Sequence, residues 1–277
     1  MVVLWQKKRM VFLLGILSGI LVSIGFVRPY QDEVTLTYVV LQLSGARGDF
    51  AMGSSLTELV GFMLRMVPNM LVIMVMGSQL YQHFCTASIY VFSRCPSRLA
   101  WYGKSLVPLF THLFLFEGTF VAAAVLAALP KCRITVSAGD VRLLGFHVVI
   151  YLLWLFGWVV LTNLIAIKLG SSPAFITVMT VQALCTAALA LVNFLERRQM
   201  QADIIEWLLC CNPVAHTVLS WHQGAPFEKE LAGSRYALNP IISLALFFLL
   251  DIVIVWAGGI LIQRQDLLSE NLETEEG

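Results

Sequence analysis

Three ionisable residues lie inside otherwise apolar stretches of this sequence: Arg65, Glu117 and Asp251. A charge at the centre of a membrane span costs about 3 kcal/mol on insertion scales, so it usually pairs or faces a polar cavity. Arg65 and Glu117 lie about 16 and about 12 residues from the same end of neighbouring stretches, which places them within about 6 Å in depth. We therefore expect Arg65 and Glu117 to pair across a helical hairpin, with a direct role in substrate passage as the alternative. Asp251 has no evident partner and is expected at a subunit interface or a cavity.

Motifs that would give the chain its own catalytic chemistry fail on inspection. Gly-Lys-Ser at 103–105 resembles the end of a phosphate-binding loop, but that motif requires a glycine where Arg98 stands. No HExxH zinc motif occurs. The remaining cluster of potential ligands has the wrong spacing for a tetrahedral zinc site and comprises Cys210, Cys211, His216 and His222. We expect no catalytic residues, no metal and no cofactor bound by this chain, which is therefore not expected to be an enzyme.

The composition is that of a membrane protein. Hydrophobic residues make up 58% of the 277 residues and charged residues 13%, whereas soluble domains carry about 25% charged residues. The net charge of +1 excludes a strongly basic nucleic-acid-binding protein. The excess of apolar side chains must face lipid.

Long apolar runs predict a single transmembrane domain, residues 1–277, of the all-α class. Backbone groups find no water in hydrocarbon, so runs of about 20 apolar residues are expected to form helices. Six spans are predicted, at 10–27, 57–81, 105–129, 143–167, 173–195 and 240–263. Residues 34–43 could form a short strand or an interfacial segment, and 199–222 an amphipathic interfacial helix.

The orientation follows from the first span. Lys7, Lys8 and Arg9 precede it, and Arg28 alone flanks its other end. The positive-inside rule then places the N-terminus in the cytoplasm, and an even number of spans places the C-terminus there too. We expect a multi-pass protein of the plasma membrane of a bacterium.

The connection between the second and third spans is rich in basic and aromatic residues. Arg94, Arg98 and Trp101 follow one another at spacings of four and three, which places them on one face of a helix. An ordinary positive-inside loop would have a similar composition. The alternative is a surface that binds a partner.

Two elements in this connection follow a pattern, "Y-x-F-S/T-R" and then "R-x-x-W-Y", and are made by Tyr90, Phe92, Ser93, Arg94, Arg98, Trp101 and Tyr102. The end of the last span reads G-G-I-L-I-Q-R-Q-D-L-L at 258–268. Both stretches resemble the ABC-2 type permease family, specifically bacteriocin and lantibiotic transporter permeases. The resemblance implies an exporter permease fold with a short cytoplasmic coupling helix and an extracellular interfacial helix before the last span.

The resemblance also implies a mechanism and partners. Residues 82–104 would dock on a separate ATPase, present in two copies, which binds the ATP and magnesium. The docking residues would be Phe92, Ser93, Arg94, Ser97, Arg98, Trp101 and Tyr102. A second permease subunit, identical or paralogous, would complete a complex that exports an amphipathic peptide, a lipid or a drug, with an extracellular gate at Asn212, Pro213 and Trp221.

Two other classes of function stay open. An ion-coupled secondary transporter could use Arg65, Glu117 and Asp251 as a relay, although no inverted repeat is evident. A non-transporting immunity or sensor subunit would share the same spans. A disulfide involving Cys132, Cys210 or Cys211 is compatible with loops that face an oxidising space.

Overall fold

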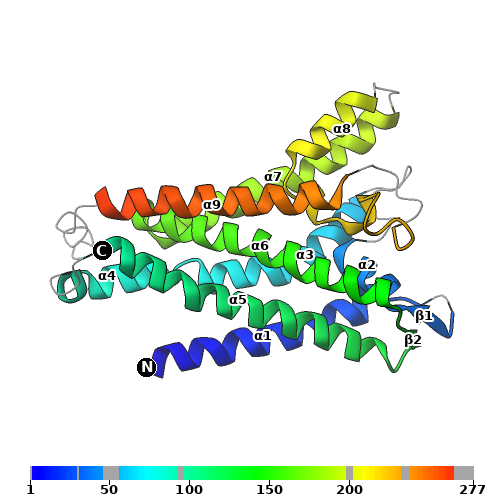
Figure 1. Ribbon diagram of the computed structural model, residues 1–277, viewed down its shortest axis with the longest axis horizontal. Coiled ribbons are helices and arrows are strands. Elements are labelled where there is room, and N and C mark those ends of the chain that lie inside the picture. The colour runs from blue at the N-terminus through cyan, green and yellow to red at the C-terminus, as the bar shows by residue number, and fades with distance from the viewer. Residues whose placement is uncertain are drawn as a thin grey trace.

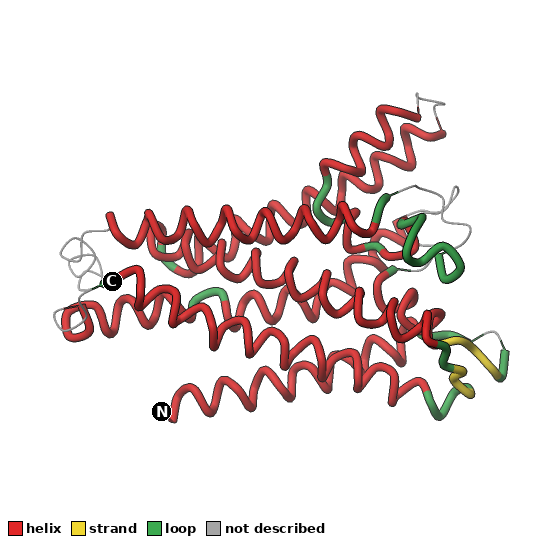
Figure 2. The backbone as a smooth tube through the Cα atoms, viewed as in Figure 1, coloured by secondary structure: helices red, strands yellow, loops and turns green. Residues whose placement is uncertain are grey.

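Long helices lying side by side make up most of the protein (Figure 1, Figure 2). The computed structural model describes residues 2–29, 31–45, 56–92, 97–197, 202–231 and 238–264. Within these ranges, six helices are long and apolar enough to cross a membrane, which agrees with the six predicted spans. They are α1 (Val2–Phe26), α3 (Leu56–Met76) continued by α4 (Gln79–Phe92), α5 (Arg98–Ala128), α6 (Ala138–Leu169), α7 (Ser171–Arg197) and α9 (Pro240–Arg264).

The bundle has two distinct ends. The N-terminal end of α1, the C-terminal end of α9 and α4 lie at one end, which we call the α4 end (Figure 1). The short α8 (Ala202–Cys211) and α2 (Leu36–Ser44) lie at the other, which we call the α8 end. Successive spans therefore run in alternating directions, as in a multi-pass membrane protein.

Helices α1 and α5 make the most extensive helix–helix contact in the described residues. Two glycines on α1 allow the close approach: a Cβ at Gly19 would lie 2.2 Å from the backbone oxygen of Phe120, and one at Gly15 would lie 2.9 Å from that of Phe116. Small residues four apart are how membrane helices bring their backbones together, because lipid offers no hydrophobic driving force.

Helix α6 lies at the centre of the bundle and packs against α5, α7 and α9. It begins at Ala138, five residues before the predicted start of its span, because Ser137 and Asp140 form a capping box. Asp140 also accepts hydrogen bonds from Thr37, through its backbone N–H at 3.2 Å and its hydroxyl at 2.5 Å. These bonds fix the start of α6 to α2.

The segment 34–43, predicted as either a short strand or an interfacial segment, belongs to a short strand followed by a helix, over residues 33–44. Strand β1 (Glu33–Thr35) pairs in parallel with β2 (Arg133–Thr135). The Thr35 side chain then accepts a hydrogen bond from Tyr38 N at 3.2 Å, and this cap starts α2. The cap explains why most of 34–43 is helical despite its β-branched residues.

The last part of α7 and the antiparallel α8 project from the α8 end of the bundle (Figure 1). Two single turns of 3-10 helix, Ala215–Thr217 and Leu219–Trp221, follow and are buried. Within the predicted amphipathic segment 199–222, the described residues 202–222 are thus a short helix and a packed turn region. Trp207 on α8 is 65% exposed, as expected for a side chain at a membrane interface.

Candidate functional site

The three ionisable residues of the spans are buried, but they do not share one site. Arg65 on α3 and Asp251 on α9 are each 7% exposed, and Glu117 on α5 is fully buried. Buried charges in a membrane are usually functional and need a partner. The surroundings of each therefore decide what it can do.

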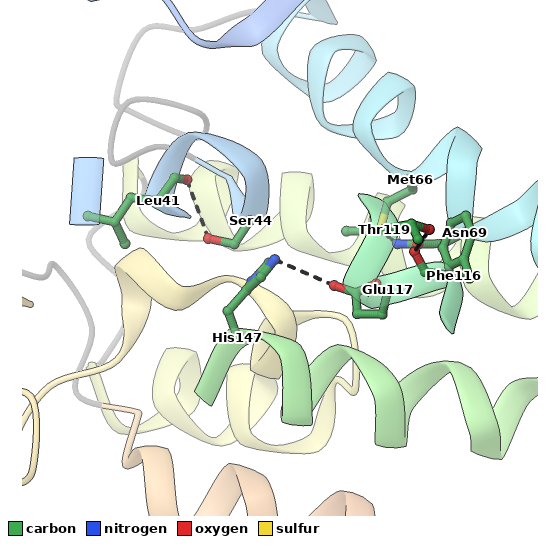
Figure 3. A network of polar contacts seen from close by, with 8 residues as sticks. All are labelled: Leu41, Ser44, Met66, Asn69, Phe116, Glu117, Thr119 and His147. Atoms are coloured by element: carbon green, nitrogen blue, oxygen red, sulfur yellow. Dashed lines mark hydrogen bonds and ion pairs between the residues drawn. The ribbon is translucent and has the colours of Figure 1, made fainter. Parts of the chain in front are cut away.

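Glu117 faces His147 of α6 inside the bundle (Figure 3). The Glu117 Oε1 and His147 Nε2 atoms lie 3.7 Å apart, and each side chain is 1% exposed. The His147 ring also lies beside that of Tyr151, with centroids 4.5 Å apart. Sequence reasoning missed His147. The available signal was its position four residues before Tyr151, on one face of a predicted span without charged residues.

Arg65 does not form the predicted ion pair with Glu117 in this structure. Its guanidinium lies over the Phe26 ring of α1, with Cζ 4.3 Å from the ring centroid, a cation–π arrangement. Helix α3 packs against α1, α6 and α7, whereas α5 packs against α1, α6 and α9. Arg65 and Glu117 both interact electrostatically with Tyr151 of α6. The predicted ion pair is therefore not formed: Glu117 faces His147, and α3 and α5 do not pack extensively as the assumed hairpin.

Several polar atoms around Glu117 are buried without a hydrogen bond. Five of these atoms have no hydrogen-bond partner among the described residues: both carboxylate oxygens of Glu117, both ring nitrogens of His147 and Nε1 of Trp154. An unpaired polar group in an apolar setting costs several kcal/mol, and such groups in native proteins call for a functional explanation. This cluster on α5 and α6 is a candidate for binding a polar group or carrying a proton.

Asp251 lines a groove of about 740 Å³ between α5 and α9. This is one of the two surroundings that the sequence predicted. Oδ1 faces α6 at Gly157, where a Cβ would lie only 2.6 Å away, so the glycine makes room for the carboxylate. Most of the other lining residues are apolar or aromatic, including Leu106, Phe110, Phe156, Val255 and Trp256.

Asn163 on α6 holds together a break in the second span, which sequence reasoning missed. Its Nδ2 donates to Met76 O at 2.9 Å, and its Oδ1 accepts from Leu80 N at 2.7 Å and more weakly from Tyr81 N at 3.4 Å. These atoms belong to the end of α3 and the start of α4, so one side chain bridges both helices. At the break, a Cβ on Gly77 would lie 2.7 Å from Thr162 Cγ2.

Two buried histidines of the α8 end share one serine. His216 Nδ1 and His222 Nε2 lie 2.7 Å and 2.9 Å from the hydroxyl oxygen of Ser243, which can donate to one of them at a time. Burial lowers the pKa of His222 to about 4 and also lowers the pKa of His216. Both imidazoles are therefore neutral near pH 7 and serve as hydrogen-bonding groups that fix the turn region to α9.

The predicted docking residues that the structure describes lie at the end of α4 and the start of α5. Ser93 and Arg94 lie outside the described residues, as does the side chain of Phe92 at the end of α4. Ser97 is exposed and caps α5 by accepting from Ala100 N at 3.3 Å. This cap starts α5 seven residues before the predicted span, so Arg98 belongs to the helix itself.

The two aromatic docking residues point into the protein to different degrees. The Trp101 ring is half-buried and lies 6.2 Å from that of Phe84, between centroids. Tyr102 is only 2% exposed, and its hydroxyl lies against α9 near Gly258. A side chain so buried is not part of an exposed docking surface in this conformation; Tyr102 lines the groove between α5 and α9 instead.

The predicted gate residues belong to the packed turn region at the α8 end. Asn212 Nδ2 donates to Cys185 O at 2.7 Å, and its Oδ1 accepts from Val214 N at 2.9 Å. Pro213 is half-buried, and Trp221 is 4% exposed. These residues therefore belong to the packed interior of that end.

The cysteines for which a disulfide was left open, Cys132, Cys210 and Cys211, carry free thiols in this structure. Although Cys210 is exposed, partial desolvation raises the pKa of its thiol, and the neighbouring Cys211 and Glu206 add to the effect. Cys210 and His216, two of the four residues whose spacing did not fit a zinc site, interact through a hydrogen bond instead. The His216 imidazole donates from Nε2 to the backbone oxygen of Cys210 at 2.9 Å.

Comparisons with known proteins leave the family of this chain open. No protein-family model matches the sequence. No curated protein and no solved structure matches it either.

Proposed function

We propose that this chain is the membrane-spanning permease subunit of an ATP-binding-cassette exporter, powered by a separate cytoplasmic ATPase. The observation that carries the proposal is the α4–α5 hairpin. It lies at the same end of the bundle as the N-terminal part of α1 (Figure 1), which carries Lys7, Lys8 and Arg9. A short helical hairpin can transmit force from a docked partner into the spans.

The break at Gly77 and Ser78 supports this role. It divides the second span into α3 and α4. Among the described hydrogen bonds, those of the Asn163 side chain are the ones that bridge the two helix ends. A docked ATPase would tilt α4 about this break and move the start of α5 with it. Because α5 packs along α1 and borders the groove with α9, that motion would reach the centre of the bundle.

The complex that we propose contains two ATPase copies, which bind ATP and magnesium, and a second permease, identical or paralogous. Its cargo would be an amphipathic peptide, a lipid or a drug. The turn region with Asn212, Pro213 and Trp221 would act as the outer gate, because it is packed at the end opposite the hairpin.

Photocrosslinking in the native host tests the docking step. A photoreactive side chain at exposed Ser97 should crosslink to a protein with a phosphate-binding loop, and the purified complex should hydrolyse ATP. The matched control is the same side chain at Gln223, which is exposed at the α8 end and should give no such product. Crosslinking at Gln223 alone, or transport by the isolated chain without nucleotide, would reject the proposal.

A second candidate, an ion-coupled carrier, is favoured by the buried Glu117–His147 pair. A carboxyl and an imidazole in hydrocarbon are the groups that proton relays use. In proteoliposomes without any ATPase, uptake driven by an imposed proton gradient and abolished by Glu117→Gln would favour the carrier. An absence of gradient-driven uptake, together with ATP-driven export in the complex, would favour the permease.

A further inference from the structure

Two buried polar groups in the α5–α9 groove have no partner in the described part of the chain. They are the Oδ2 atom of Asp251 and the hydroxyl of Tyr102, whose residues are 7% and 2% exposed. Of the lining residues that the structure describes, the rest are largely aliphatic and aromatic, with Gln263 as the other polar side chain and no basic residue. An apolar pocket with a few convergent polar groups is the usual form of a small-molecule site.

The polar groups specify the chemistry of the ligand. The Asp251 carboxylate only accepts hydrogen bonds when ionised, so a group that both donates and carries positive charge would satisfy it. The aromatic faces of Phe110, Phe156 and Trp256 line the same groove and can attract a cation further. The apolar walls select a ligand whose body is lipophilic.

The geometry also specifies a length. Tyr102 touches α9 at Gly258, seven residues from Asp251, which corresponds to about 10 Å along the helix. A ligand that reaches both groups is therefore elongated, with its amine near mid-span at Asp251. Its second polar group lies nearer the α4 end.

We propose that the groove between α5 and α9 binds a lipophilic amine, whose ammonium group donates to Asp251 and whose second polar group bonds Tyr102. This binding needs neither nucleotide nor a partner, so it goes beyond the proposed function and does not depend on it. A second copy of this chain suits the groove less well. A symmetric contact there would bring two Asp251 carboxylates toward each other in a medium of low dielectric constant.

Direct binding to the purified full-length chain in lipid nanodiscs tests the site. The probe is dansyl cadaverine, a primary amine with an alkyl linker to a fluorescent sulfonamide, and the readout is energy transfer from tryptophan to dansyl. Asp251→Asn should weaken binding at least about tenfold, and Tyr102→Phe roughly threefold, the effect of one hydrogen bond. Dodecylamine should displace the probe at least about tenfold better than dodecanol.

Two control variants separate the groove from other effects of charge and lipid. Glu33→Gln removes a carboxylate from the exposed pair with Arg133 and should leave binding unchanged. Ile252→Trp, at an exposed position of the groove, should block the probe while Asp251 stays in place. Thermal unfolding of each variant establishes that it is folded.

Three results would overturn the proposal. One is equal affinity of the wild-type protein and the folded Asp251→Asn variant. Another is equal displacement by the amine and the alcohol, which would show that the site reads only apolar surface. The third is a wild-type protein that is dimeric and does not bind the probe, together with an Ile252→Trp variant that is monomeric. This result would make the groove a subunit contact.

Discussion

Glu117 is costly to keep in its position, because a carboxyl in the centre of the bundle has an imidazole at 3.7 Å and no hydrogen bond in the described residues. Replacing a poorly satisfied buried polar group with an apolar one of similar size is often neutral or stabilising. Glu117→Leu should therefore raise the midpoint of thermal unfolding in detergent and at the same time abolish transport.

The matched control for Glu117→Leu is Phe116→Leu, one residue away and fully buried, which should lower the midpoint by leaving a cavity. A clear loss of stability in Glu117→Leu would instead mean that the carboxyl stabilises the helix packing. Unchanged transport in that variant would remove Glu117 from the functional site.

His222 makes stability depend on pH. Burial lowers its pKa to about 4 in the folded protein, whereas an unfolded histidine titrates near 6.5. Between these values the unfolded chain binds a proton that the folded protein rejects, so stability should fall as pH drops from about 6.5 to about 4, by up to about 3 kcal/mol. Unfolding midpoints measured across this range, compared with those of His222→Gln, isolate the contribution of this imidazole.

The stability advantage of the wild-type protein over His222→Gln should shrink as the pH falls. Parallel curves for the two proteins would contradict the assignment. The neighbouring His216, whose pKa is lowered in the same direction, should add a similar slope to both proteins.

At the scale of elements, the break between α3 and α4 depends on one side chain. Asn163→Ala leaves Met76 O and Leu80 N without their partner, and each unsatisfied buried group costs about 1–3 kcal/mol. We expect a loss of roughly 2–4 kcal/mol, seen as a lower unfolding midpoint. The control is Thr162→Val, because the Thr162 hydroxyl bonds only Trp158 O of its own helix among the bonds described. Equal effects of the two variants would rule out the bridging role.

The contact between α1 and α5 requires glycine at position 19. Gly19→Leu would place a side chain where even a Cβ lies 2.2 Å from Phe120 O, so the helices must separate, and the yield of monodisperse protein after size-exclusion chromatography should collapse. Gly25→Leu lies on the same helix with nothing within 4 Å of its Cβ position and should behave like the wild type. A well-folded Gly19→Leu protein would show that the packing of α1 is adaptable.

Hydropathy was enough to predict the six spans, because hydrocarbon leaves long apolar runs no stable form except a helix. Partners across the bundle could not be predicted in the same way. Depth along a helix is readable from sequence, but which helix lies opposite is not, and so Glu117 was assigned to Arg65 rather than His147. Asn163 was missed because a single neutral amide barely changes the hydropathy of a span, although it bridges two helix ends.

At the scale of the whole molecule, the orientation in the membrane decides whether the hairpin can meet an ATPase. The proposed orientation puts the α4 end in the cytoplasm and the α8 end outside. Cys210 and Cys211 are exposed at the α8 end, and Ser97 is exposed at the hairpin. A membrane-impermeant maleimide should therefore label the two native cysteines in intact cells. The Ser97→Cys variant should be labelled more strongly than the wild-type protein only after the cells are permeabilised.

The raised pKa of Cys210 adds an internal check, since the thiolate is the reactive form. In a Cys211→Ser background, labelling of intact cells should accelerate as the pH rises from 7 to 9, and Cys210→Ser should abolish it. The inverse pattern, with Ser97→Cys labelled in intact cells and Cys210 only after permeabilisation, would place the hairpin outside. An ATPase could not then reach α4, and the buried Glu117–His147 pair would become the leading basis for function.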